Sequence, residues 1–490
     1  MSPPNPPGRS RWWVLVALFP ALGIPNLDGT MVIVALPTIG RELGGSISDL
    51  QWITVMFALG NATLLPLSAS LGDLYGRRRT MMLGYWLYLV GTIAAALTPT
   101  VGLLLGTRAV QGFGMALLFP NALAQIGVVF DERERGKAVG IWIGLSSGAL
   151  IAGPPAAGWL VENVAWPAIF WVTASVTVIG AAGMVRFVPD DGVRRQASID
   201  YPGMVTATVA LFFLTFGFVE AGRRGLTSPI VWVSVALGLV TAAAFVLIER
   251  RSDHPMVDPA LFANSSFGTV LRIGVCANTA VTGVFFLIVL YLQSVLSMSP
   301  WAAGVILAIV FVPLTFSPYL AGTAGDRLGF ERPLIMGMVL MATSLAWFGL
   351  VATSDSSIAT ILPPLAFFGL ALGWHFSIES TAIVSSVPPT FASAGSASLS
   401  AVRQVGASFS VALFGTFATF ATQFRSRATL EPLGYDTDGV RFASFESSMP
   451  EEIEAVIRAA SGEAFGDLMI LAAIVFGLGV LVGLPLLRRS

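Results

Sequence analysis

Long apolar segments recur along the whole chain and are separated by short polar connections. Each is long enough, at about 1.5 Å per helical residue, to cross a hydrocarbon core about 30 Å thick. The segments fall at residues 12–39, 50–71, 80–98, 102–129, 138–160, 166–188, 202–220, 228–248, 265–293, 301–322, 333–352, 358–384, 396–424 and 465–487. This pattern predicts an all-α integral membrane protein with fourteen transmembrane helices.

Composition supports a membrane protein and excludes several kinds of site. Hydrophobic residues make up 55% of the 490-residue chain and charged residues 11%, and the mean hydropathy is +0.79. A soluble protein has about 25% charged residues. The single cysteine, Cys276, excludes an intrachain disulfide, and two histidines with one cysteine exclude a Cys/His metal cluster. We therefore expect no cofactor.

Lys and Arg side chains predict the orientation in the membrane. With the N-terminus inside, the internal connections hold clusters such as Arg77–Arg79, whereas the short external connections hold only Arg41, Arg223 and Arg224. Because cytoplasmic loops are enriched in Lys and Arg, both termini are expected in the cytoplasm. The segment from residue 12 is too long for a signal peptide and has no small-residue cleavage site, so we expect a retained first helix.

The chain contains an internal repeat. LGDLYGRRRT follows the second apolar segment and AGDRLGFERP follows the tenth, which places Asp73 and Asp326 253 residues apart. The first and ninth segments start with the same offset. We therefore expect a six-helix half over residues 1–188, two inserted helices with linkers over 189–264, and a second six-helix half over 265–490 with an external loop over 425–463. Two parallel repeats are a transporter architecture.

Asp28 is the only charged residue in the first apolar segment. An ionised, unpaired carboxylate in hydrocarbon costs about 2.5–3.5 kcal/mol or more, so a partner is expected. At helical rise, Asp28 lies roughly 24 Å and Arg108 roughly 21 Å from the inner surface. The two can form a structural pair, or a site where a proton on Asp28 is coupled to the charge of Arg108. Gln111 and Met115 share a helix face with Arg108.

The second half carries its own buried charges. Glu379 lies roughly 8–10 Å from the inside, and Arg403 and Arg272 lie roughly 10 Å deep, which suggests a second pairing. His375 precedes Glu379 by four residues and shares its helix face. The two side chains can form a proton relay or a hydrogen-bonded polar pair.

The loop after the second segment holds Asp73, Gly76, Arg77 and Arg78, and the loop after the tenth holds Asp326 and Arg327. Gly76 permits a tight turn, and Asp73 can cap a helix or pair with an arginine. The arginines can also be plain cytoplasmic anchors. ASLGDLYGRRR resembles the loop signature of the major facilitator superfamily, although Ala69 stands where the family has its first glycine. The resemblance implies a latch between the cytoplasmic sides of the two halves.

The fifth segment contains GALIAGPPAAG, with Gly148, Gly153 and Gly158 around Pro154. Small residues let helices approach closely, so packing alone can explain the string. It also resembles the superfamily's antiporter signature, with Ala157 in place of a glycine. NLDGTMVIVALP, HPMVDPALFANSSF and AVRQVGASFSVALFG are similar to segments of the fourteen-helix drug:proton antiporters, as is RAVQGFG to the arginine motif of the fourth helix.

These resemblances imply a proton-coupled antiporter that exports small molecules across the cytoplasmic membrane by alternating access. The aromatic and Met residues of the expected cavity, with few charges, indicate amphiphilic substrates, and the strong preference for Arg over Lys, with abundant Ala and Gly, indicates a bacterium. The alternative is a proton-independent carrier of lipids or metabolites with the same fold. The sequence offers neither the convergent catalytic set of an enzyme nor the repeated ring of a channel. Protons, substrate and the bilayer are the expected partners, with a monomer and no nucleic acid. The expected substrate cavity holds Asn26, Trp52, Met56, Gln111, Met115, Phe285, Trp374 and Arg403.

Overall fold

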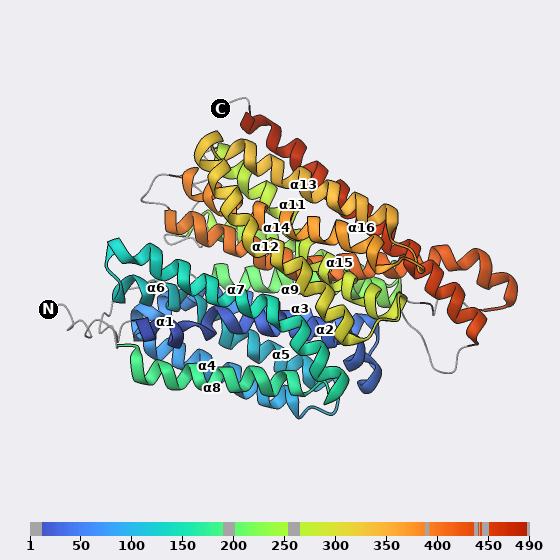
Figure 1. The fold of residues 1–490 in the computed structure, drawn as a ribbon, viewed down its shortest axis with the longest axis horizontal. Coiled ribbons are helices and arrows are strands. Elements are labelled where there is room, and N and C mark those ends of the chain that lie inside the picture. Colours follow the sequence, from blue (N-terminus) through green and yellow to red (C-terminus); the bar gives the residue numbers. More distant parts are fainter. Residues whose placement is uncertain are drawn as a thin grey trace.

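The computed structural model describes residues 12–189, 201–252, 265–387, 392–435, 440, 442 and 450–487, and within these residues it contains helices and no strands (Figure 1). The N-terminal α-helices are α1 (Trp12–Leu18), α2 (Pro20–Leu43), α3 (Ile47–Tyr75), α4 (Arg77–Ala96), α5 (Val101–Ala116), α6 (Phe119–Val129), α7 (Glu132–Asn163) and α8 (Ala168–Phe187). The others are α9 (Tyr201–Arg224), α10 (Pro229–Glu249), α11 (Ser265–Leu290), α12 (Pro300–Leu328), α13 (Glu331–Val351), α14 (Ile358–Ser385), α15 (Ala392–Leu430) and α16 (Glu451–Leu487). A π-helical turn, η2 (Tyr291–Val295), extends α11, and a 3-10 turn, η4 (Glu431–Leu433), follows α15.

Twelve helical segments in the described part of the chain are long and apolar enough to cross a membrane. The paired helices α1–α2 and α5–α6 each count as one of them, and α3 and α4 are not included. The fold class expected from the sequence is confirmed as all-helical and membrane-spanning, but the count of fourteen spans is not.

Two of the expected helices are interrupted. The first apolar segment bends at Phe19, before Pro20, and the fourth breaks after Ala116, before Pro120. Proline lacks a backbone N–H and crowds the preceding turn, so both breaks occur where the sequence removes a helical hydrogen bond. The sequence pattern missed them because apolarity continues across both breaks.

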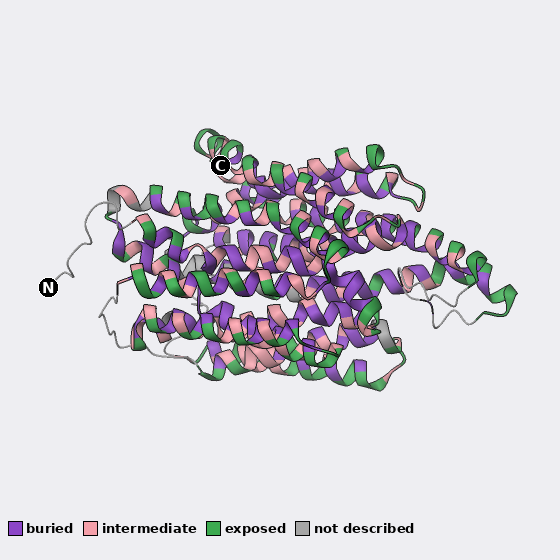
Figure 2. Cartoon of the chain, turned by 60° about the horizontal axis from the view of Figure 1, so that its bottom comes forward, coloured by how far each residue is buried: buried purple, intermediate pink, exposed green. Residues whose placement is uncertain are grey.

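Helices α1–α8 form one group and α11–α16 another, and the two groups lie side by side (Figure 1). Two large helix contacts join them, α7 against α12 and α3 against α15, and α2 adds smaller contacts with α11 and α12. The inserted helix α9 packs against α10 and against both α3 and α15, so it covers the α3–α15 seam. Buried residues face the helix contacts while exposed residues face outward (Figure 2). The outward residues include large apolar side chains, as expected where the surrounding medium is lipid.

The internal repeat is visible in the backbone. Helix α12 starts and ends 253 residues after α3, at Pro300 and Leu328. Each is followed by a glycine with positive φ, 95° at Gly76 and 74° at Gly329. A side chain is strained at such φ values, so both copies of the loop use glycine to turn sharply into the next helix.

The expected external loop over 425–463 is wrong in part. Helix α15 continues to Leu430, and α16 begins at Glu451, so helical structure occupies both ends of that range. Arg425 pairs with Glu463 at 2.5 Å and with Asp467 at 2.6 Å, which holds the two helix ends together. These ends extend past the rest of the bundle at the right of Figure 1. The polar composition of residues 425–463 is therefore explained by helix ends that extend beyond the bundle.

Candidate functional site

Asp28 and Arg108 form a buried ion pair between α2 and α5. Arg108 Nη1 lies 2.7 Å from Asp28 Oδ2, and the side chains are 2% and 1% exposed. Arg108 Nη1 also donates to Gln111 Oε1 at 2.8 Å, and its Nε donates to the carbonyl of Ile53 on α3 at 3.3 Å. A buried charge is tolerated only when it is paired and hydrogen-bonded, and this arrangement supplies both conditions. The pair expected from equal depths is thus present.

Helix α4 completes the network with residues that the sequence analysis missed. Tyr88 Oη donates to Asp28 Oδ1 at 3.0 Å, and Gln111 Nε2 donates to Thr92 Oγ1 at 2.7 Å. Tyr88 and Thr92 are four residues apart, so they lie on one face of α4. A polar pair at that spacing in an apolar helix was the available signal. Phe57 adds a cation–π contact, with its ring centroid 4.5 Å from the Arg108 guanidinium carbon.

A second ion pair lies in the other half. Arg403 donates to Glu379 Oε2 through Nη2 at 2.5 Å and through Nε at 3.1 Å. Asn278 on α11 lies 3.4 Å from Glu379 Oε1. Glu379 is fully buried, whereas the Arg403 side chain is 34% exposed. Arg272, the other basic residue expected here, donates to Thr269 instead.

The expected hydrogen-bonded pair of His375 and Glu379 does not form. Both ring nitrogens of His375 are buried without a hydrogen-bond partner. Glu379 satisfies its oxygens with Arg403 and Asn278, because a guanidinium offers a charged, forked donor that a neutral imidazole does not. Sharing a helix face therefore did not suffice for a contact.

The two repeated loops differ in their contacts. Arg77 pairs with Asp73 at 3.2 Å, and Arg78 Nη2 donates to the carbonyl of Val185 on α8 at 2.7 Å. These contacts tie the loop to its own half. Asp326 and Arg327 lie exposed at the end of α12. The latch between halves stays a prediction.

The glycines of α7 sit where that helix touches two others. A Cβ at Gly153 would overlap Thr30 Oγ1 of α2, and one at Gly158 would overlap the carbonyl of Pro300 at the start of α12. Conversely, a Cβ at Gly304 of α12 would overlap the carbonyl of Pro154. A Cβ at Gly148 would meet nothing within 4 Å. The α7–α12 seam is therefore a close backbone crossing that includes Pro154 and Gly158, two of the four predicted residues, whereas Gly153 packs on α2.

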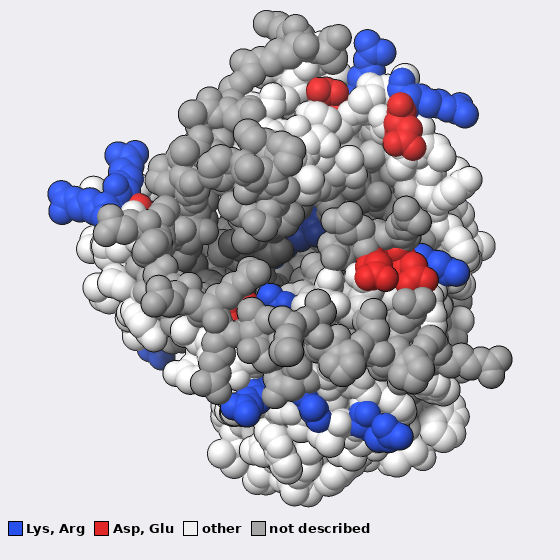
Figure 3. Space-filling view, turned by 90° about the vertical axis from the view of Figure 1, so that its left-hand side faces the viewer, with Lys and Arg blue, Asp and Glu red and all other residues white. Residues whose placement is uncertain are grey.

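Side chains also close the molecule at the end opposite the termini. Gln51 Nε2 of α3 donates to the carbonyls of Val411 and Ala412 on α15 at 3.1 and 3.3 Å. Gln293 Nε2 donates to the carbonyl of Val34 at 2.7 Å. The face at the termini end is hollowed near its centre, with basic atoms at the edge of the hollow (Figure 3). Hydrogen bonds thus join the two groups of helices at the end opposite the termini.

The residues expected to line one substrate cavity are dispersed. Met56 lines a cavity of about 250 Å³ between α3, α5 and α9, and Trp52 packs beside it against Phe212 and Phe216. The others pack elsewhere: Phe285 stacks on Phe311, Trp374 Nε1 donates to the carbonyl of Pro333, Asn26 Nδ2 donates to the carbonyl of Ser146, and Met115 is buried in the first half. Among the described residues, no group of three or more His, Cys, Asp or Glu side chains is placed to hold a metal ion.

The family model described as Major Facilitator Superfamily matches residues 18–411. The puromycin resistance protein pur8 of Streptomyces alboniger is 32% identical over 85% of this chain and 83% of its own length. The tetracenomycin C resistance and export protein of Streptomyces glaucescens is 31% identical over 83% of this chain and 76% of its own length. A bacterial homologue of the human lysosomal transporter Spinster superposes with a TM-score of 0.65 at 16% identity, covering 97% of this chain and 96% of that structure.

Proposed function

This chain belongs to the major facilitator superfamily of membrane transporters, and from that premise we propose that it is a proton-coupled antiporter that exports amphiphilic small molecules. In this proposal α3 and α4 also span the membrane, which gives fourteen spans with α1–α2 and α5–α6 as single segments. The two groups of helices are the halves that move, and α9 and α10 are the inserted pair. The protein acts as a monomer in a bacterial cytoplasmic membrane with both termini inside.

The observation that carries the proposal is the Asp28 network. A proton on Asp28 would remove the negative charge opposite Arg108 and weaken the 2.7 Å ion pair that joins α2 to α5. The pair in its present form suits an ionised carboxylate. Proton binding and loss would therefore alternate between two arrangements of these helices, as antiport requires.

The contacts of α7 offer a route from Asp28 to the seam between the halves. Thr30 lies two residues after Asp28 and packs on Gly153 of α7, whose next residue packs on α12. With the termini inside, the sealed end is external and the hollow faces the cytoplasm. Loss of the Asp28 proton would then accompany the inward-open state, in which substrate enters.

The remaining predicted residues receive roles in the same scheme. Glu379 and Arg403 form a second charge pair that can respond to protons in the other half. We assign His375 no relay, because its ring does not bond to Glu379. The loops at Asp73 and Asp326 meet when the inner end closes, which makes Arg77, Arg78 and Arg327 gate residues.

Transport into proteoliposomes under an imposed pH gradient tests the proposal. Puromycin and tetracenomycin C are the first substrates to use, because two similar proteins are named for resistance to them or for their export. Gradient-driven transport should be lost in Asp28→Asn, while Glu452→Gln, which changes an exposed carboxylate on α16, should behave like the unmodified protein. Equal transport with and without a gradient would instead indicate a proton-independent carrier.

A further inference from the structure

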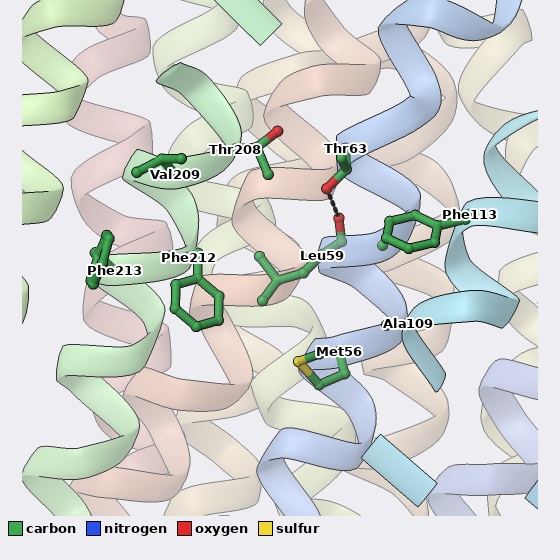
Figure 4. Close-up of a pocket in the computed structure, with 10 residues that line it drawn as sticks. Met56, Leu59, Thr63, Ala109, Phe113, Thr208, Val209, Phe212 and Phe213 are labelled. Carbon is green, nitrogen blue, oxygen red and sulfur yellow. Dashed lines mark hydrogen bonds between the residues drawn. The ribbon is translucent and has the colours of Figure 1, made fainter. Parts of the chain in front are cut away.

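The cavity between α3, α5 and α9 lies at the middle of the membrane-spanning segments. It has a volume of about 250 Å³ (Figure 4). Its lining comes from three helices and consists of Met56, Leu59, Gly60, Thr63, Ala109, Phe113, Thr208, Val209, Phe212 and Phe213. These residues fall near the centres of α3 and of the span Tyr201–Ala221, far from both membrane surfaces.

The cavity lies on the outer wall of the first half, on the lipid side. Phe113 lies on the same face of α5 as Gly106, seven residues earlier, and Gly106 is exposed. Arg108 points away from that face, about 140° around the helix from Phe113 at 100° per residue. Its guanidinium reaches Asp28 in the interior. The cavity and the ion pair therefore lie on different sides of α5.

The lining is apolar, aromatic and uncharged, with one free polar group. Thr63 Oγ1 donates to the carbonyl of Leu59 at 2.8 Å, as the dashed line in Figure 4 marks. The hydroxyl of Thr208, at the same end of the cavity in Figure 4, has no hydrogen-bond partner within the described part of the chain. Phe and Met side chains suit flat or irregular apolar ligands. An unpaired hydroxyl at this depth favours a ligand that brings a hydrogen-bonding atom.

We propose that this cavity binds the uncharged aromatic part of an exported amphiphile that has entered from the bilayer. The inference rests on the proposed export function and names the substrate class. Whole drug-sized ligands occupy about 300–1,000 Å³, so a cavity of this size takes one end of such a molecule. A lipid acyl chain fits less well, because it has no polar atom near mid-membrane for Thr208.

The cavity wall is also the support of the proton site. Helices α3 and α5 cross so closely that a Cβ at Gly60 would overlap the carbonyl of Ala109, and one at Gly112 would overlap that of Phe57. Arg108 Nε bonds to Ile53 on the same α3. A ring inserted beside this crossing would press on the two helices that position Arg108. The bound substrate and the proton on Asp28 thus act on the same pair of helices, α3 and α5, from opposite sides.

Photolabelling with benzophenone, which has two aromatic rings and one carbonyl acceptor, tests the site directly. The full-length protein is placed in lipid nanodiscs without a gradient, irradiated, and mapped by peptide mass spectrometry. We expect saturable labelling at Met56 and Phe113. Val209→Trp, which fills the cavity, should lower the labelling at least tenfold. Val240→Trp changes a site on α10 that is 66% exposed and should leave the labelling unchanged.

A second variant keeps the test decisive if Val209→Trp misfolds. Thr208→Val preserves shape and removes the hydroxyl, so the benzophenone concentration for half-saturation should rise about three- to tenfold. Labelling that never saturates would overturn the site. A phospholipid with a diazirine in its acyl chain provides a competing label. If it labels these residues saturably and benzophenone does not displace it, the site belongs to lipid and the proposal is overturned. Because labelling needs no gradient, its outcome is separate from that of the proteoliposome assay.

Discussion

Thr30 of α2 occupies the space that a side chain at Gly153 of α7 would need. A Cβ on Gly153 would overlap Thr30 Oγ1, which itself donates to the carbonyl of Asn26 at 2.7 Å. The segment that carries Asp28 is therefore fixed against the helix that meets α12. A change at this contact should reach both the proton site and the seam between the halves.

Gly153→Ala should impair transport by forcing α2 and α7 apart. Overpacking of a close helix contact costs about 1–3 kcal/mol, and melting in detergent should show it. Adding Thr30→Ala should restore both stability and transport, because it removes the overlapping hydroxyl. Gly144→Ala on the same helix meets nothing within 4 Å and serves as the control. If the double variant stays inactive with normal stability, the contact does not explain the need for glycine.

Tyr88→Phe should change the pH dependence of transport and leave the fold intact. Tyr88 donates to Asp28 Oδ1 at 3.0 Å, so its hydroxyl is in direct contact with the proposed proton site. Without it one oxygen of the buried carboxylate loses its donor, and a hydrogen bond to a charged group contributes about 1.5–3 kcal/mol, so the pH profile of transport should differ from that of the unmodified protein. Tyr85→Phe removes a hydroxyl that contacts Ala17 instead and should leave the profile in place. A profile that Tyr88→Phe does not move would argue against Asp28 as the proton site.

The sequence predicted features that depend on strong local or energetic constraints. Hydrophobic segments marked the helices, and the energetic need to pair Asp28 identified Arg108 at the same depth. The loop repeat predicted the equivalence of α3 and α12, which the turns at Gly76 and Gly329 display. These features can be predicted from sequence because a buried charge and a sharp turn each allow few residue types.

Features set by the packing of distant helices were not predictable. The spacing of Tyr88 and Thr92 marks a polar face of α4, but their partners Asp28 and Gln111 are known only once α4 is placed against α2 and α5. His375 shares a face with Glu379, yet Arg403 from another helix takes the carboxylate. Trp52 and Met56 were expected to face a central cavity, and the inserted helix α9 instead gives them a lateral one. Helical spacing gives the direction of a side chain and not the identity of its neighbour.

Arg403→Ala should destabilise the second half more than the double variant Arg403→Ala/Glu379→Gln, in which both charges are removed. Glu379 is fully buried, so loss of Arg403 leaves a carboxylate without its cationic partner, which costs about 3–5 kcal/mol for a buried pair. Adding Glu379→Gln should recover much of the loss in melting temperature. The double-mutant cycle thus measures the coupling of the two charges. Purely additive losses would show that the pair contributes little to stability.

Gly415→Ala should loosen the seam at the end opposite the termini. A Cβ there would overlap Gln51 Nε2, whose hydrogen bonds to Val411 and Ala412 join α3 to α15. We expect more molecules to open at this end. In a Cys276→Ser background, which removes the native cysteine, Ala412→Cys places a thiol in the seam.

Reaction of that thiol with a membrane-impermeant maleimide added to intact cells measures the opening. Ala412 is fully buried, so labelling should be slow until Gly415→Ala raises it. Gly477→Ala on α16 meets nothing within 4 Å and should leave the rate unchanged. Labelling that occurs only in everted vesicles would place this end in the cytoplasm and reverse the proposed orientation. Because the arginine distribution and the sealed seam both depend on which end is external, this one rate tests the direction of transport together with the gate.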